Sequence, residues 1–104
     1  MVAIPKQIQI QADPTAGLKV DPDPQPCSVS QNGHVEWSSG KAVKDWRVIF
    51  GANAPVDPKV ASPKHKKLKL MASRPEDLRH VKYVVVALVD GALQHRDPEL
   101  IVDR

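Results

Sequence analysis

The amino-acid sequence predicts an all-β fold, a Greek-key β-sandwich of seven to eight strands that forms a single domain over residues 1–104. Short segments in which apolar and polar residues alternate, a pattern typical of half-buried strands, recur along the chain. Turn-forming dipeptides separate these segments at intervals of roughly 8–12 residues. The chain also has ten prolines against five glycines, and that many prolines exclude long uninterrupted helices.

The overall composition is that of a globular protein. The 104 residues are 41% hydrophobic and 26% charged, which argues against a chain that is disordered as a whole. No apolar run approaches the roughly 18–20 residues needed to cross a bilayer, so a membrane-embedded protein is excluded. The N-terminal segment lacks the basic start and apolar core of a signal peptide. The chain as written is therefore predicted to be cytoplasmic, or periplasmic if it begins at a mature terminus.

The first two strands are predicted from alternation near the N-terminus. Ile8 and Ile10 alternate with glutamines, and residues 17–20 predict a second short strand. Asp-Pro dipeptides mark turns and strand edges, because proline lacks the N–H that a ladder requires and pushes its predecessor toward extended geometry. They occur at Asp13-Pro14, Asp21-Pro22, Asp23-Pro24, Asp57-Pro58 and Asp97-Pro98.

A β-hairpin is predicted around Asn32-Gly33. Residues 27–30 alternate before this dipeptide, and residues 34–37 alternate after it. Asn-Gly is the usual two-residue hairpin turn, because both of its central positions accept a positive φ. The two arms are therefore expected to pair with each other.

The middle of the chain predicts two strands separated by a long excursion. Residues 45–50 alternate, with Trp46 and Phe50 on the same face. Residues 51–66 carry three prolines and little pattern, and a loop of this length in a small domain is either functional or mobile. Residues 67–71 alternate again, with their leucines directed inward.

The C-terminal third predicts one short helical turn and two further strands. The turn lies near residues 74–79, with a serine or arginine cap and a proline at its first helical position. Residues 81–90 form the longest apolar run, which predicts a central strand covered on both faces. Asp90-Gly91 then turns the chain, and residues 99–102 form the last strand. The scarce aromatic side chains are expected to dominate the core: Trp37, Trp46, Phe50 and Tyr83.

Three segments together resemble the cupredoxin family: SVSQNGHVEW, then WRVIF, and finally KYVVVALVDG with DPELIV. In that family a hairpin precedes a loop that carries the first copper histidine, and a final hairpin carries cysteine, histidine and methionine. The resemblance covers most of the chain and implies a cupredoxin-like fold.

The copper ligands do not carry over from this resemblance. A blue-copper centre needs a thiolate and two imidazoles in a trigonal arrangement with a weak axial ligand. Trp46 stands at about the position of the first histidine, and the closing segment offers only His95 and no cysteine. Cys27 lies early in the chain, where the family has no ligand. The resemblance therefore implies a copper-free scaffold with no cofactor.

A degenerate metal or redox site built from His80, His95 and Cys27 is the alternative. The two histidines flank the long final strand, but no spacing pairs them. Cys27 alternates with Val29 and is expected to be a small buried hydrophobe, and nothing near it supplies the low pKa of a reactive thiol. The histidines are expected to be exposed to solvent.

One dense basic segment precedes and includes the strand at 67–71. It is a candidate patch for anions or nucleic acid, formed by Lys64, Lys66, Lys67 and Lys69. Lysines that alternate with inward leucines are also typical of a solvated edge strand that resists edge-to-edge aggregation. The net charge of +3 is mild, and aromatic residues for base stacking are absent from the segment, which disfavours a nucleic-acid partner.

No catalytic constellation is found in the sequence. The serines lack the context of a nucleophile elbow, and there is no glycine-rich phosphate loop. The sequence thus favours a non-enzymatic binding or assembly module whose partner is an unknown protein or small ligand. Because sheet edges are templates for strand addition, a homodimer through a sheet edge is one form of this hypothesis.

Overall fold

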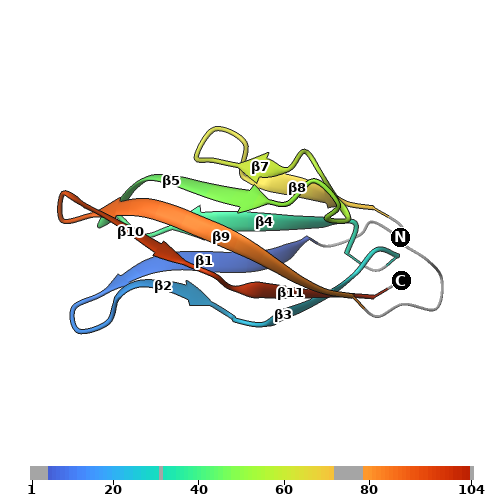
Figure 1. The fold of residues 1–104 in the computed structure, drawn as a ribbon, viewed down its shortest axis with the longest axis horizontal. Helices are drawn as coiled ribbons and strands as arrows, with labels where there is room; N and C mark the ends of the chain where they lie inside the picture. Colours follow the sequence, from blue (N-terminus) through green and yellow to red (C-terminus); the bar gives the residue numbers. More distant parts are fainter. Residues whose placement is uncertain (1–4, 31, 72–78, 104) are drawn as a thin grey trace.

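The computed structural model describes residues 5–30, 32–71 and 79–103, which form two β-sheets packed face to face (Figure 1). The first sheet has the strand order β2-β1-β4-β8-β6. Its strands are β1 (Lys6–Asp13), β2 (Gly17–Asp21), β4 (His34–Ser39), β6 (Val56–Asp57) and β8 (Lys67–Leu70). The second sheet has the order β3-β11-β9-β5-β7, and β10 also pairs with β9. Its strands are β3 (Gln25–Ser28), β5 (Val43–Phe50), β7 (Val60–Ala61), β9 (Arg79–Val89), β10 (Ala92–Arg96) and β11 (Glu99–Asp103).

The all-β sandwich predicted from the sequence is confirmed, with more strands than expected. The described residues form eleven strands, against a prediction of seven to eight. The three additional strands are the two-residue β6 and β7 and the strand β10, which follows the turn at Asp90-Gly91. The helical turn predicted near residues 74–79 falls mostly on residues outside the described ranges, and Arg79 already belongs to β9. Within those ranges, no helix is long and apolar enough to cross a membrane.

The hairpin predicted at Asn32-Gly33 is wrong, because β3 and β4 belong to different sheets. β3 pairs in parallel with β11, whereas β4 pairs in parallel with β1 and antiparallel with β8. The turn carries the chain between the sheets: the Asn32 N–H donates to Ser28 O at 2.9 Å, and the Ser28 N–H donates to Asn32 Oδ1 at 2.8 Å. Two alternating arms look the same in a sequence whether they pair or face each other across a core.

The segment of residues 51–66 also crosses from one sheet to the other. β6 pairs with β8 in the first sheet, and β7 pairs with β5 in the second. The Lys59 ammonium holds the segment together, because Nζ donates to Ala54 O and to Val56 O, both at 2.6 Å. The predicted long excursion is therefore an ordered connection that closes one side of the sandwich.

The long strand β9 lies in the middle of the second sheet, as predicted, but only one of its faces is fully buried. Alternate residues from Val81 to Val89 point into the core and are buried. The residues between them point outward: Lys82 is exposed, and Val84, Val86 and Leu88 are half-buried. The prediction that β9 is covered on both faces is therefore wrong. The apolar run predicted a second layer over the outer face of β9, because strands that are buried on both faces have the same apolar composition.

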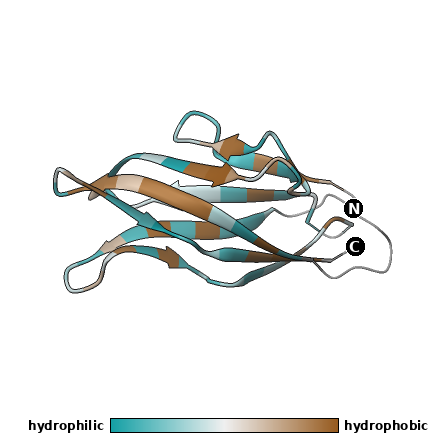
Figure 2. Cartoon of the chain, in the orientation of Figure 1, coloured by the Kyte–Doolittle hydropathy of each residue, from teal (hydrophilic) through white to brown (hydrophobic). Residues whose placement is uncertain are grey.

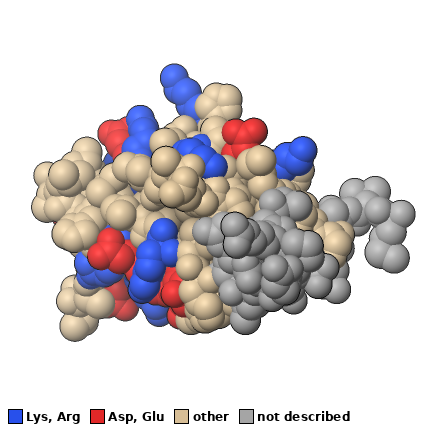
Figure 3. Space-filling view, turned by 45° about the vertical axis from the view of Figure 1, so that its right-hand side comes forward, with Lys and Arg blue, Asp and Glu red and all other residues tan. Residues whose placement is uncertain are grey.

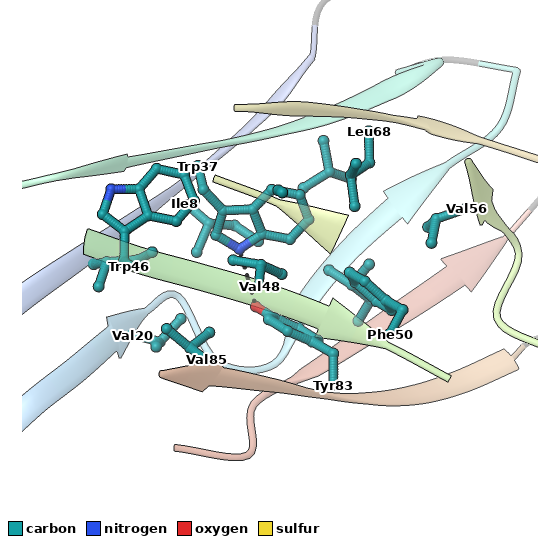
Figure 4. Close-up of a cluster of buried hydrophobic side chains, with 14 of the residues drawn as sticks. Ile8, Val20, Trp37, Trp46, Val48, Phe50, Val56, Leu68, Tyr83 and Val85 are labelled. Carbon is teal, nitrogen blue, oxygen red and sulfur yellow. Dashed lines mark hydrogen bonds between the residues drawn. The ribbon is translucent and has the colours of Figure 1, made fainter. Parts of the chain in front are cut away.

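Three aromatic rings form the centre of the core (Figure 4). The Trp37 ring packs edge-on against Phe50 and Tyr83, with centroid distances of 5.9 and 5.7 Å, and Phe50 stacks on Tyr83 at 4.7 Å. Trp37 Nε1 donates to Tyr83 Oη at 3.4 Å, which gives both buried polar atoms a partner. Burial raises the pKa of Tyr83 above its usual value. Together with the buried Trp46, these residues confirm the predicted aromatic core.

Strands β10 and β11 are two halves of one arm that pairs antiparallel with β9. Arg96 faces Val85 and Glu99 faces Lys82, so the register continues across Asp97-Pro98 without a shift. The β11 half lies beside β3 in the second sheet. The β10 half instead reaches the edge of the first sheet through side chains: the Leu18 N–H donates to Gln94 Oε1 at 2.8 Å, and Arg96 Nη2 donates to Ala16 O at 2.7 Å. The β10 half of the arm thus covers the edge strand β2, and the β11 half pairs with β3.

Candidate binding face

The outer surface of the second sheet, which we call the β9 face, carries a stripe of apolar side chains. Residues directly opposite each other in an antiparallel pair point to the same side of a sheet. Ile49 faces both Val84 and Val60, so these three form one row across β9, β5 and β7. Leu88 faces Leu93 on β10. The apolar stripe consists of Val60, Ile49, Val84, Val86, Leu88 and Leu93.

The stripe is open to solvent at both ends and half-buried in its middle. Leu93 is 74% exposed, Val60 45% and Ile49 42%, while the three β9 residues are half-buried by their neighbours in the sheet. Figure 2 shows hydrophobic residues concentrated in β9, in the end of β5 and in β7. Contiguous exposed apolar patches on small proteins mark interaction sites more often than isolated apolar residues do. The stripe is therefore the primary candidate for a functional surface.

The β9 face carries three exposed cations. Lys44, Arg47 and Lys82 lie at outward positions of β5 and β9, and exposed Asp45 and Asp97 lie near them. The one ion pair among the described residues joins His80 Nδ1 to Glu99 Oε1 at 3.4 Å, on the same face. In the view of Figure 3, cationic and anionic side chains are interspersed over a largely uncharged surface. The cations of the β9 face therefore lie beside the apolar stripe as single charges and do not form one basic cluster.

A hollow opens on this face where β5 ends, and we call it the Gly51 hollow. Continuing the register one residue past the pair Phe50–Tyr83 places Gly51 beside Lys82. A Cβ built on Gly51 would have no atom within 4 Å, so the missing side chain leaves an open space. The hollow has a volume of about 500 Å³. It is lined by Ile49, Phe50, Gly51, Lys82, Tyr83, Val84 and Asp97.

The structure does not bring the predicted metal candidates together. Cys27 is buried in the core on β3, and burial raises the pKa of its thiol to about 11. His80 and His95 are both exposed, but His95 faces Val86, which lies six residues along β9 from His80, about 20 Å in an extended strand. No group of three or more His, Cys, Asp or Glu side chains in the described residues is arranged to hold a metal ion.

The predicted lysine patch lies on the other sheet. Lys64 and Lys66 are exposed in the turn before β8, and Lys67 and Lys69 point outward from β8. Lys67 faces Glu36, so part of the positive charge is offset by a neighbouring carboxylate. The prediction that this strand is a sheet edge is wrong for its second half, because β6 pairs with β8 at its C-terminal end. Short strands of two residues leave no signal in an alternation pattern.

The prediction of a doubly covered strand concealed the apolar stripe, because it placed Val84, Val86 and Leu88 on a second buried face. A signal was present: Lys82 and Lys44 occupy outward positions in the same strands, and a charged side chain rarely sits on a fully buried face. None of the known protein families, curated proteins or solved structures that were searched matches this chain. Function must therefore be inferred from the chain's own residues.

Proposed function

We propose that this protein is a non-enzymatic binding module that docks a polypeptide partner with apolar and acidic side chains on the β9 face. The observation that carries the proposal is the apolar stripe on the outside of the second sheet. The stripe residues of β5, β7 and β9 are not needed to close the core, because their inward neighbours on the same strands already do so. Apolar side chains kept at the surface at this density favour a role in contact with a partner.

The size of the β9 face suits contact with one polypeptide segment. Its four neighbouring strands, β10, β9, β5 and β7, have 5, 11, 8 and 2 residues. At about 3.3 Å per residue and about 4.8 Å between strands they cover roughly 400 Å², about half of the roughly 800 Å² that each partner buries in a standard interface.

The charges on the β9 face favour an acidic partner over a second copy of this chain. Lys44, Arg47 and Lys82 flank the stripe. Of the carboxylates near them, Glu99 already contacts His80, and Asp45 and Asp97 are exposed. Two copies docked face to face would bring like charges together, which is unfavourable. Carboxylates on the partner would complement the three cations and steer its approach.

The described sheet edges are less suited to a partner than the face is. The β2 edge is covered by the side chains of Gln94 and Arg96. β3 contains Pro26, which cannot donate to a neighbouring strand, and β6 and β7 are only two residues long. Short, covered or proline-containing edges resist strand addition. We therefore place the partner on the face, in preference to a homodimer through an edge.

The proposal includes a copper-free, cupredoxin-like scaffold as the support of this face. What supports it is the sandwich of two mixed sheets, together with the place of Cys27 among buried core residues. The raised pKa of that thiol keeps it in the neutral form near neutral pH, which suits a packing role.

A titration followed by ¹⁵N–¹H NMR tests the proposal. The probe is an acetylated nine-residue peptide with leucine at positions 1, 5 and 9, glutamate at 3 and 7, and serine between. We expect shifts confined to outward residues of β5, β9 and β10, and weaker binding when lysine replaces both glutamates. Shifts on the first sheet, or none, would contradict the proposal. Concentration-dependent shifts without peptide would show that the face takes a second copy.

Matched variants locate the contact. Leu93→Asp places a negative charge at the most exposed end of the stripe, and Gln11→Asp places the same charge on the outer face of the first sheet. We expect Leu93→Asp to weaken binding of the acidic peptide by about fivefold or more, through lost apolar contact and repulsion. Gln11→Asp should leave binding unchanged. Equal effects of the two variants would show that the peptide responds to net charge alone.

A further inference from the structure

The Gly51 hollow exists because of a glycine that the backbone does not require. Three glycines have a positive φ, at positions 17, 33 and 91, and Gly51 is not among them. The position could therefore hold a larger residue without left-handed strain, and nothing lies within 4 Å of a Cβ built there. What the glycine provides is open space on the β9 face.

The walls of the hollow are apolar on the side of the stripe. Ile49 and Val84 face each other across β5 and β9 and separate the hollow from the rest of the stripe. Its volume of about 500 Å³ lies within the range of about 300–1,000 Å³ found for binding pockets. It can take one large apolar side chain together with the neighbouring backbone.

The polar groups of the hollow are one cation and one carboxylate. Lys82 Nζ donates to the Asp97 backbone oxygen at 3.3 Å, which holds the ammonium at the rim. An ammonium has three donors, so two can serve an external carboxylate. Asp97 also lines the hollow, and a carboxylate repels a second carboxylate on its own side, whereas it can accept a hydrogen bond from a backbone N–H.

The apolar wall and the cation have a fixed spacing. Val84 and Lys82 are outward residues two positions apart on β9, about 7 Å in an extended strand. Same-side residues of an extended partner segment have the same spacing. We infer that the Gly51 hollow is the anchor site of the β9 face, and that it takes a large apolar side chain together with an acidic one two residues away. This inference rests on the proposed function.

Short peptides test the spacing directly by NMR titration. The probe is acetyl-Ser-Leu-Ser-Glu-Ser-amide, compared with a peptide in which glutamate directly follows leucine. Further controls replace glutamate with glutamine and leucine with alanine. We expect the amides of Gly51, Lys82 and Val84 to shift with the probe. The two controls that move or neutralise the glutamate should bind about two- to fivefold more weakly, the size expected for an exposed ion pair. The alanine control should bind about fivefold or more weakly, because it loses the apolar contact. Equal binding of the two spacings would overturn the inference.

Two glycine variants provide the matched control. Gly51→Trp fills the hollow, whereas Gly40→Trp adds the same side chain at another glycine that has no atom within 4 Å of a built Cβ and lies outside the hollow. We expect Gly51→Trp to abolish binding of the five-residue probe and Gly40→Trp to leave it unchanged. Gly51→Leu fills the hollow with a smaller side chain. The dispersion of the NMR spectrum verifies that each variant is folded. Unchanged binding to Gly51→Trp would overturn the anchor site.

Lys82→Gln and the nine-residue peptide separate the two proposals. Lys82→Gln should remove the preference for glutamate over glutamine in the five-residue probe while leaving the leucine contact in place. If Gly51→Trp binds the nine-residue peptide as the wild type does, the anchor inference fails and the face remains the docking surface. If the wild type does not bind the nine-residue peptide at all, the proposed function itself fails.

Discussion

The two sheets of this sandwich have similar inner faces and different outer faces. The inner faces of both bury aliphatic and aromatic side chains in one core. On the outside of the first sheet, β1 presents Gln7, Gln9 and Gln11, and Gln7 Nε2 donates to Glu36 Oε1 at 2.8 Å. The outside of the second sheet carries the apolar stripe. The first sheet thus shows that this fold needs no outward apolar residues for its stability.

The same contrast appears among the most exposed apolar residues. Four large hydrophobic side chains in the described part of the chain are strongly exposed, and three of them lie on the β9 face: Ile49, Val60 and Leu93. The fourth, Met71, follows β8. Because exposed apolar side chains gain nothing from burial in the free protein, their concentration on one face supports the proposal that this face docks a partner.

The largest stability effect is expected from the inner face. Trp37→Ala should lower the free energy of unfolding by about 3–5 kcal/mol, because it leaves a cavity and removes the hydrogen-bond partner of the buried Tyr83 hydroxyl. Urea denaturation measures the change. A loss of under about 1 kcal/mol would mean that the aromatic cluster is not the centre of the core.

The inner face of the second sheet can be probed through pH. Burial raises the pKa of Cys27 from 9.0 to about 11. The unfolded chain therefore releases this proton first, and the stability that the neutral thiol contributes is complete below pH 9 and is lost as pH rises toward 11. The free energy of unfolding, measured by urea denaturation, should fall across this window by an amount on the order of 2 kcal/mol.

Cys27→Ala is the control for this titration. The variant should show a shallower fall between pH 9 and 10, because only the wild type has a thiol that the unfolded chain ionises there. The contribution of Tyr83, whose pKa burial raises from its ordinary value of 10.0, is the same in both proteins. An unchanged slope in the variant would assign the pH dependence to other groups and would remove support for a buried thiol.

The hydrogen bond between Leu18 and Gln94, which links the two sheets, is expected to have an intermediate effect on stability. Gln94→Ala removes the side-chain oxygen that accepts the Leu18 N–H, and leaves a part-buried donor without its partner. The expected cost is about 1–2 kcal/mol. Hydrogen exchange at the Leu18 amide should accelerate more than exchange at the Val20 amide. Equal acceleration of the two amides would indicate general loosening of β2 in place of a local contact.

The smallest stability effect is expected on the β9 face. Val86→Thr should change the free energy of unfolding by less than about 1 kcal/mol, because Val86 is only half-buried and its side chain is not part of the core. Binding of the nine-residue peptide should weaken nonetheless. Val85→Thr, one residue away on the inner face, should destabilise the fold more strongly. The comparison fails if the two variants are equally destabilised.

The sequence predicted individual strands better than their partners. Alternation located β1, β5 and β8 because a half-buried strand exposes every second residue to water. It could not show that the arms around Asn32-Gly33 lie in different sheets, since pairing depends on contacts that are distant in the chain. Two-residue strands such as β6 are too short to show a period at all.

The candidate site was missed for a related reason. Sequence composition reports that Val84, Val86 and Leu88 are apolar but does not report whether another layer covers them. The Gly51 hollow depends on register, because Gly51 matters only through its place beside Lys82 on the neighbouring strand. Neither feature is local, so neither could be derived before the order of the strands was known.

The unbroken register of β10 and β11 across Asp97-Pro98 limits how this chain can vary in evolution. Replacement of either residue keeps the register of the arm. One added residue would instead turn the side chains of one half to the opposite face of the sheet. Leu100 and Val102, now buried, would turn to the solvent, and Glu99 and Ile101 would enter the interior. Length at this joint should therefore be more strictly preserved than the identity of its residues.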